Sequence, residues 1–506
     1  MEKTNDNLTL GRRSFIGGGA AFFVAAGLGH SAFGAAGGSA RLRVGVLSDV
    51  HVIGGLPGAN ANAGSCETFE KALRYSCSRG VDAVVIAGDM ADNGLESQRR
   101  GMGDAWRRVF PGNKRPDGGH VEKVFVTGNH DVEGWKYGYA KQYGITEAKN
   151  ADDILALHMA ESWKRVFDEE YSPMYIKDVK GYKFVGVHFN PAAGYHKKGA
   201  IANFLESHRA ELEGDKPFFY TQHYHPKGTC SAPWTWGQDD GFSTAALYAF
   251  PNAVAFTGHS HTPLTDERTL WRGAFTSVGT ASLRYLIPFG GRENSRIFGA
   301  KDVGTQQMPF LGCADGHHGQ LMTVYDDRLV LERRDFENDL PAGPDWVVPL
   351  PAAAETFAAR AKKCAVPEFP AGTEVKLERV SGTNRAKKPV EQIVVSFPNV
   401  LGVMGGARAF DFEVTVEAED VDRAKTWMTK RVYSPHFYWA PEKDDLEVKC
   451  LFALSELPMA NGNLETRRGR RFRFAVSPAN CYGAQGRAIR SKWITGDFGE
   501  KKAVAK

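Results

Sequence analysis

The chain has 506 residues, of which 42% are hydrophobic and 24% are charged, a balance that is typical of folded globular proteins and excludes a disordered chain. Its length exceeds that of one ordinary domain, so more than one folded unit is expected. The formal net charge is only +4, which gives no general attraction to polyanions, and the spacing of the seven cysteines matches no zinc-binding motif.

The first 39 residues resemble a twin-arginine export signal. Arg12 and Arg13 precede an apolar, Gly- and Ala-rich stretch from Ile16 to Leu28, and small residues follow from Ser31 to Ala40. An apolar stretch this short is typical of a signal peptide and not of a membrane-spanning helix. We therefore expect export by the twin-arginine translocase, a periplasmic or extracellular location, and no stable membrane span after cleavage.

Four apolar, β-branched runs after this segment end directly at polar side chains. The runs are Leu42–Leu47, Val81–Ala87, Val124–Thr127 and Ala253–Thr257. Short runs of this kind that end in turn residues are typical of buried strands in a parallel or mixed sheet. Functional side chains gather past the carboxyl ends of such strands, so residues far apart in the sequence should converge at one edge of the sheet.

Five short blocks rich in Asp, Asn and His provide the polar side chains, and four of them follow these runs. They are Asp49-Val50-His51, Gly88-Asp89, Gly128-Asn129-His130-Asp131, His223, and Gly258-His259-Ser260-His261. Carboxylate, amide and imidazole groups are ligands for Mn, Fe or Zn. Any one block is an ordinary turn or loop, but all five in this order indicate a metal centre.

The series of blocks resembles the signature of the calcineurin-like metallophosphoesterase superfamily, D-x-H, GD, GNH(D/E), H and GHxH, over residues 41–340. The resemblance implies an α/β fold, a four-layer α/β/β/α sandwich, with two divalent metal ions (Mn, Fe or Zn) at the sheet edge. The ligands of the first metal would be Asp49, His51, Asp89 and His261. Those of the second would be Asp89, Asn129, His223 and His259, so that Asp89 bridges the two ions.

The resemblance also implies roles for His130 and Asp131. A water that bridges two metals loses a proton near neutral pH, and this hydroxide would attack the phosphoester. His130 would face the substrate, where it stabilises the transition state or protonates the leaving oxygen. Asp131 would orient the imidazole of His130.

At three positions the sequence allows more than one interpretation. The family's His-His-Pro-Pro or His-Tyr-Pro segment favours His223 as the ligand, with His225 as the alternative ligand or a substrate contact. Purple acid phosphatases carry a Tyr three residues after the bridging Asp, where this chain has Asp92, so we expect no Fe(III)–tyrosinate centre and read Asp92 as part of a turn. His188, after the strand Lys183–Val187, either faces the substrate or only ends the strand.

The chain changes character after Leu340. A predicted hairpin closes the catalytic region, a Pro-rich passage with a short helix over Ala352–Lys363 follows, and the rest reads as short strands. We predict a signal peptide at 1–39, a phosphoesterase domain at 40–340, a linker at 341–370 and a C-terminal all-β domain, a fibronectin- or Ig-like sandwich, at 371–506.

Local patterns in the C-terminal region make further predictions. Phe472–Gly483 resembles the penultimate strand and turn of fibronectin type III domains, whereas Asp420–Thr429 has the period of a helix. Arg471 and Arg473 alternate with phenylalanines, which favours a solvated strand face over a nucleic-acid site. Two disulfides are conceivable in an oxidising compartment, Cys66–Cys77 and Cys450–Cys481.

Together these features predict an exported phosphoesterase that acts on phosphodiesters or phosphomonoesters, with a small-molecule or envelope-derived substrate. The alternative is an envelope- or glycan-binding surface protein, in which the C-terminal domain does the main work and hydrolysis is subsidiary.

Overall fold

The structure is a computed structural model that describes residues 38–53, 64–136, 156, 158–190, 197–230, 237–287, 316–383, 388–400, 407–419, 424–434, 447–458 and 471–494. The chain divides into two units, Met1–Gly38 and Ser39–Lys506, and every element below belongs to the second. The predicted signal segment therefore lies outside the described residues, apart from its end. Among the described helices, none is both long and apolar enough to cross a membrane.

A seven-stranded mixed sheet forms the first half of the predicted phosphoesterase region. Its strands are β1 (Leu42–Leu47), β2 (Ala83–Ala87), β3 (Glu122–Val126), β10 (His318–Val324), β11 (Arg328–Asp335), β12 (Leu340–Pro341) and β13 (Trp346–Pro349). β1, β2 and β3 are parallel, and β10 pairs with β1 in the antiparallel sense. β10 and β11 form the predicted hairpin, and β12 and β13 both pair with β11, so the sheet extends to Pro349.

A six-stranded sheet forms the second half. Its strands are β4 (Met174–Val179), β5 (Tyr182–Val187), β6 (Phe218–Thr221), β7 (Ala253–Thr257), β8 (Leu270–Arg272) and β9 (Thr276–Gly279), in the order β4-β5-β6-β7-β9-β8. β5, β6, β7 and β9 are parallel. The two sheets pack face to face, because one apolar cluster contains Val44 of β1, Phe219 of β6 and Val254 of β7.

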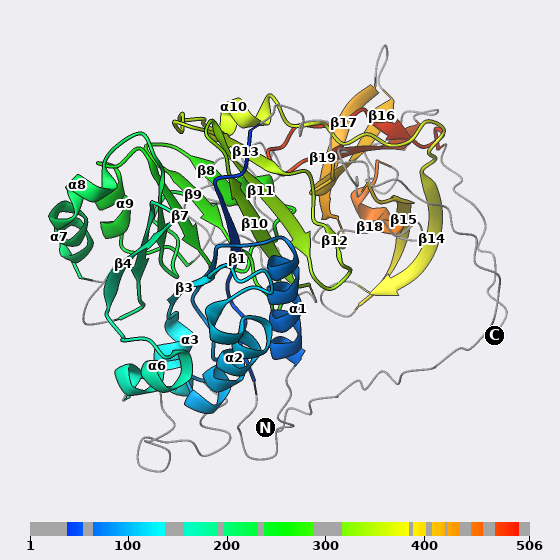
Figure 1. Ribbon diagram of the computed structural model, residues 1–506. Helices are drawn as coiled ribbons and strands as arrows, with labels where there is room; N and C mark the ends of the chain where they lie inside the picture. The colour runs from blue at the N-terminus through cyan, green and yellow to red at the C-terminus, as the bar shows by residue number, and fades with distance from the viewer. Residues whose placement is uncertain are drawn as a thin grey trace, which may run out of the picture. The chain divides into compact units, whose positions relative to one another are not determined.

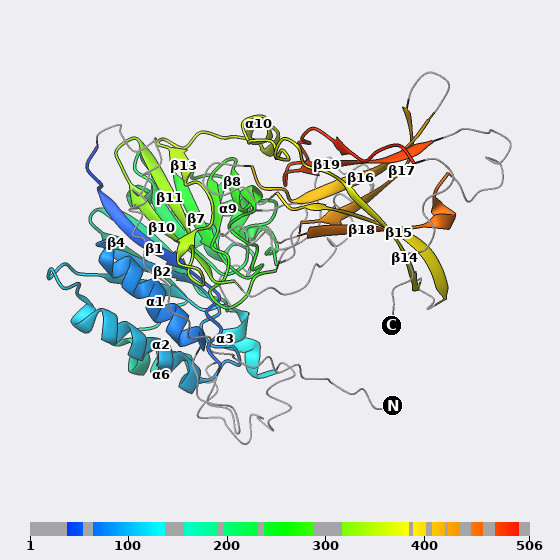
Figure 2. The same ribbon diagram turned by 90° about the vertical axis from the view of Figure 1, so that its right-hand side faces the viewer.

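Helices cover the outer faces of both sheets (Figure 1, Figure 2). α1 (Gly64–Ser78), α2 (Glu96–Val109) and α6 (Met159–Phe167) bury Phe69, Met102 and Trp163 against the first sheet. α7 (Ala200–Ser207), α8 (Arg209–Leu212) and α9 (Phe242–Leu247) cover the second sheet, where Leu205 and Leu247 are buried. These four layers confirm the predicted α/β/β/α sandwich.

Two antiparallel sheets form the C-terminal region, as predicted. β14 (Lys376–Thr383), β15 (Pro389–Pro398) and β18 (Glu447–Ala453) form one sheet. The other contains β16 (Asp411–Glu419), β17 (Ala424–Tyr433), β19 (Phe472–Ala479) and β20 (Ile489–Arg490). Alternate residues of both sheets share one apolar core that includes Val395, Phe412 and Phe474. Among the described strands, β19 is the penultimate one, where the fibronectin-like segment was expected.

Two local predictions are wrong, that of a helix in the C-terminal region and that of two disulfides. The helix expected over Asp420–Thr429 is strand β17 from Ala424 onward, because pairing with β16 overrides the local helical period. Neither disulfide forms, since the six cysteines within the described residues have free thiols. Cys66 and Cys77 lie on the same helix, about 16 Å apart along its axis, which is too far for a disulfide. Cys450 and Cys481 belong to separate apolar clusters.

The described parts of the linker and of the basic run agree with their predictions. A short helix, α10 (Phe357–Ala361), lies within the predicted Ala352–Lys363. Arg471 and Arg473 pair with Glu419 and Glu417 of the neighbouring strand β16, so they form a solvated, charge-paired strand face. The domain boundaries themselves remain predictions.

Candidate dimetal centre

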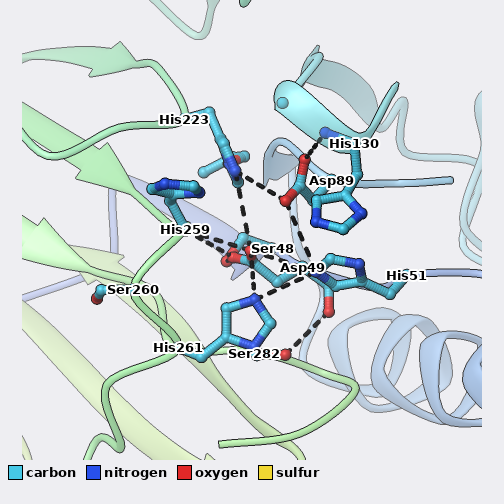
Figure 3. A network of polar contacts seen from close by, with 12 residues as sticks. Ser48, Asp49, His51, Asp89, His130, His223, His259, Ser260, His261 and Ser282 are labelled. Atoms are coloured by element: carbon cyan, nitrogen blue, oxygen red, sulfur yellow. Dashed lines mark hydrogen bonds and ion pairs between the residues drawn. The ribbon is translucent and has the colours of Figure 1, made fainter. Parts of the chain in front are cut away.

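All five blocks follow strands of the two sheets. Asp49 and His51 follow β1, Asp89 follows β2, Asn129 follows β3, His223 follows β6, and His259 and His261 follow β7. The strand ends from both sheets meet, so six of the seven side chains predicted as ligands gather in one buried site (Figure 3): Asp49, His51, Asp89, His223, His259 and His261.

Asp49, His51 and His261 form the first half of the site. His261 Nε2 lies 3.0 Å from Asp49 Oδ1 and 3.2 Å from His51 Nε2. One ligand atom from each of the three residues lies within 4.8 Å of the others, and all three side chains are buried. These are the residues predicted for the first metal, together with Asp89.

Asp89, His223 and His259 form the second half, with the same spacing of ligand atoms. Asp89 Oδ2 lies 3.0 Å from His223 Nε2 and 3.6 Å from His51 Nε2, so this carboxylate stands between the two halves. Asn129 begins the short helix α3 (Asn129–Glu133) and is buried. A carboxylate between two His/Asp groups is the arrangement that two neighbouring divalent cations require, and the donors therefore fit the predicted pair of metals.

Three of the histidines are held by oxygen atoms behind them. The Nδ1 atom of His223 donates to Ala87 O at 2.7 Å, and that of His261 donates to Tyr285 O at 2.9 Å, because a carbonyl oxygen can only accept. Nδ1 of His51 lies 3.0 Å from Asp92 Oδ1. In the neutral ring each Nε2 is thereby left without the proton, and it is directed into the site, as metal-binding histidines require.

In this site, burial and the neighbouring charges shift the pKa values of the side chains in opposite directions. Burial disfavours charge on the histidines, but Asp49 and Asp92 raise the pKa of His51 well above its ordinary value, and Asp89 and Asp49 raise the pKa of His223 to about 9. Burial likewise disfavours charge on Asp49, yet His261 and His223 hold its pKa well below the ordinary value. Cations that bind here must therefore displace protons from these histidines.

Backbone conformation is unusual at most of the ligands. Five of the seven have a positive φ, between 44° and 67°: Asp49, His51, Asp89, His259 and His261. Residues other than Gly rarely adopt a positive φ, and each such residue costs about 1–3 kcal/mol of stability. Such conformations persist only where the surrounding structure holds them in place, and they are typical of functional sites.

The glycines of the blocks allow the carboxylates to approach. A Cβ atom at Gly128 would overlap Asp89 Oδ1, and one at Gly258 would overlap Asp49 Oδ2. The missing side chains also let backbone N–H groups reach the same carboxylates, since His130 N donates to Asp89 Oδ1 at 2.8 Å and His259 N donates to Asp49 Oδ2 at 3.1 Å. The block glycines are therefore required by the packing around the two aspartates.

Residues 42–263 match the family model of the calcineurin-like phosphoesterases. They form a calcineurin-like phosphoesterase domain. No curated protein has a significant sequence match to the chain.

Solved structures match the chain only at low sequence identity and with low TM-scores. A dimetal phosphatase from Danio rerio is 14% identical, with 62% of this chain and 99% of that chain covered and a TM-score of 0.32. A purple acid phosphatase from yellow lupin (Lupinus luteus) is also 14% identical, with 62% and 54% covered and a TM-score of 0.37. A predicted phosphoesterase from Streptococcus pneumoniae is 12% identical, with 61% and 97% covered and a TM-score of 0.25. These scores are below 0.5, so the assignment rests on the family match and on the site itself.

His130 lies beside the predicted metal ligands of the phosphoesterase domain. Its ring contacts the His51 ring edge-on, with 4.6 Å between the centroids, and its side chain is 25% exposed, unlike the buried ligands. Its Nδ1 atom donates to Asp92 O at 2.7 Å, which fixes one ring proton on that nitrogen.

The hydrogen bonds of Asp131 support the backbone of the neighbouring loops, whereas the sequence predicted that it orients His130. Its buried carboxylate accepts hydrogen bonds from the backbone N–H groups of Met90, Ala91 and Gly128, at 3.1, 2.9 and 2.9 Å. Because these bonds turn the carboxylate toward the Asp89 loop, it holds that loop against the loop of Asn129, and the imidazole of His130 is oriented by Asp92 instead.

Asp92 is the site residue that sequence reasoning missed. It was read as a turn, but its carboxylate contacts Nδ1 of His51 while its carbonyl oxygen accepts from His130. Asp92, His51 and His130 also place one ligand atom each within 4.8 Å of one another. The available signal was its place three residues after Asp89, where purple acid phosphatases carry a metal-bound Tyr.

Neither of the two open histidines, His188 and His225, belongs to the groups of possible metal ligands among the described residues. His225 Nδ1 lies 2.6 Å from Thr257 Oγ1 and its Nε2 lies 2.7 Å from Ser260 Oγ, so both ring nitrogens are occupied and His223 is the residue that faces Asp89. His188 is buried against Trp163 and accepts a hydrogen bond from Thr127 N at its Nδ1, and burial lowers its pKa to about 3. It supports the end of its strand.

Proposed function

We propose that the chain is an exported dinuclear-metal phosphoesterase that hydrolyses phosphodiesters or phosphomonoesters. The observation that carries this proposal is the pair of buried His/Asp groups that share the Asp89 carboxylate within a calcineurin-like phosphoesterase domain. Two divalent cations bound there would neutralise phosphoryl oxygens and lower the pKa of the attacking water, which we infer to act as a bridging hydroxide.

The side chains around the metals have separate tasks in this proposal. His130 meets the substrate, and because its Nδ1 proton is held by Asp92 O, a proton on Nε2 is the one that it delivers to the leaving oxygen. Asp92 contacts both His130 and the ligand His51, so it fixes the position of the acid relative to the first metal site. Asp131 fixes the loops that carry Asp89 and Asn129.

Export is supported by the amino-terminal sequence alone. Arg12 and Arg13 with the following apolar stretch favour the twin-arginine translocase as a partner and the periplasm or cell exterior as the location. That route carries folded proteins, which suits an enzyme that acquires its metals before export. A small-molecule or envelope-derived phosphoester is the substrate that such a location favours.

The proposal is tested by hydrolysis of bis(p-nitrophenyl) phosphate beside p-nitrophenyl phosphate. The mature chain is stripped of metal and reloaded in turn with Mn, Fe(II) or Zn. We expect turnover that depends on the metal, and a slight lean towards the diester because the metal-bound Tyr of purple acid phosphatases is absent. Activity that survives complete metal removal would refute the dimetal proposal, and the Asp89→Asn chain is the matched inactive control.

A further inference from the structure

The segment that follows the last metal ligand is buried under the C-terminal β-domain. His259 and His261 lie on the loop after β7, and residues 259–270 are buried with the exception of Glu267. Asp266 and Arg268, five and seven residues after His261, form a buried ion pair in which Arg268 Nε and Nη2 donate to the carboxylate at 2.9 and 2.6 Å.

Side chains of the C-terminal domain cover this ion pair. The guanidinium of Arg268 lies over the ring of Phe410, 4.9 Å from its centroid, and Phe410 directly precedes β16. Tyr482, in the turn after β19, donates its hydroxyl to Glu267 O at 3.1 Å. Phe410 and Tyr482 belong to one small apolar cluster and are themselves buried.

Glu267 connects this contact to the phosphoesterase sheet. Its carboxylate accepts from Arg333 Nη1 of β11 at 2.7 Å and from Trp346 Nε1 of β13 at 2.6 Å. The same Arg333 nitrogen donates to Leu264 O at 2.8 Å, and Leu264 is only three residues from His261. A continuous chain of contacts therefore runs from Tyr482 through Glu267 and Arg333 to the ligand loop.

We propose that the C-terminal β-domain is part of the support of the metal centre, with Tyr482 and Phe410 as positioning residues for the loop of His259 and His261. The inference rests on the proposed metal centre. A buried ion pair is stabilising only when its geometry is well fixed, and here the C-terminal domain packs against the pair of Asp266 and Arg268 and fixes it. A binding module joined by a flexible linker would need no such contact, since the interfaces of independently moving domains are more polar than those of permanently packed domains.

The test uses the full chain with Tyr482→Phe, which removes the hydroxyl that donates to Glu267 and keeps the ring. The matched control is Tyr433→Phe, because Tyr433 packs on Phe410 in the same cluster but its hydroxyl accepts from Arg431 within the C-terminal domain. Two quantities are measured for each chain: the Kd of Mn²⁺ by chelator competition, and hydrogen exchange of peptides covering residues 258–270 in the metal-free protein.

We expect Tyr482→Phe to raise the Kd of Mn²⁺ by roughly 2- to 30-fold and to speed exchange in the 258–270 peptides, whereas Tyr433→Phe matches the wild type. Equal Kd values and equal exchange in the two variants would overturn the proposal, even if Tyr482→Phe melts earlier. If Tyr482→Phe does not fold, Phe410→Leu replaces it, since it keeps the apolar packing and removes the ring face under Arg268. A wild type that binds no metal would refute the proposed function, while the exchange measurement would still decide the support role.

Discussion

At the residue scale, three of the four histidines predicted as ligands owe their orientation to an oxygen atom that their sequence block does not contain. Ala87 O, Asp92 Oδ1 and Tyr285 O hold His223, His51 and His261 from behind. The ligands themselves were predictable, because their residue types and order form a known signature. The oxygen atoms that hold these histidines were not predictable, since a backbone carbonyl such as that of Tyr285 becomes a hydrogen-bond partner only when the folded chain brings it next to the ring.

His130 provides the first residue-scale prediction. His130→Ala removes the proposed acid but none of the groups predicted to bind metal, so metal content should stay unchanged while kcat falls by about 10²–10⁴-fold. Steady-state rates beside elemental analysis of the purified variant check this. Loss of metal together with activity would show that His130 acts as a ligand.

Asp92 provides the second. Asp92→Asn weakens the hold on His51 and His130, and losses of this kind typically cost about 10- to 100-fold in metal affinity or activity. Turnover of the metal-saturated chain is compared with that of Asp104→Asn, a change on the exposed side of α2. Equal rates in the two variants would remove Asp92 from the site.

At the element scale, the strand ends determine where the chemistry lies. The parallel strands β1, β2 and β3 and the pair β6 and β7 end at one edge, and this was predictable from apolar runs that stop at polar blocks. β17 was not, because its local pattern is helical and only its pairing with β16 makes it a strand. Asp131 shows the same limit, since its backbone partners lie in the loop after β2.

Close approach at the loops gives an element-scale prediction. Gly258→Ala places a methyl group against the Asp49 carboxylate, so we expect loss of metal binding and a lower melting temperature. Gly118→Ala is the control: its φ of 85° costs about 1–2 kcal/mol, but a Cβ there meets open space. Metal titration of both variants checks this, and normal metal affinity in Gly258→Ala would contradict it.

At the scale of the whole molecule, the metal centre links pH to stability. In the metal-free chain the pKa of His223 is raised from 6.5 to about 9, so its proton stabilises the fold fully below pH 6.5 and this contribution disappears as the pH rises through 9. Bound metal replaces that proton, and its affinity therefore increases over the same range.

We predict opposite trends for the two forms between pH 6.5 and 9. The melting temperature of the metal-free chain should fall with rising pH, while the increase that a fixed Mn²⁺ concentration produces should grow, because stabilisation follows the ratio of ligand concentration to Kd. Thermal unfolding with and without Mn²⁺ at several pH values measures both. A metal effect that shrinks as the pH rises would contradict this linkage.

The proposed dimetal centre is tested most directly by the number of metal ions per chain in the wild type and in Asp89→Asn, after loading with Mn²⁺ and removal of the excess. Asp89 stands between both halves of the site, so we predict two ions in the wild type and fewer than two, with loss of hydrolysis, in the variant. Two tightly bound ions and full activity in Asp89→Asn would contradict a centre built on a shared carboxylate.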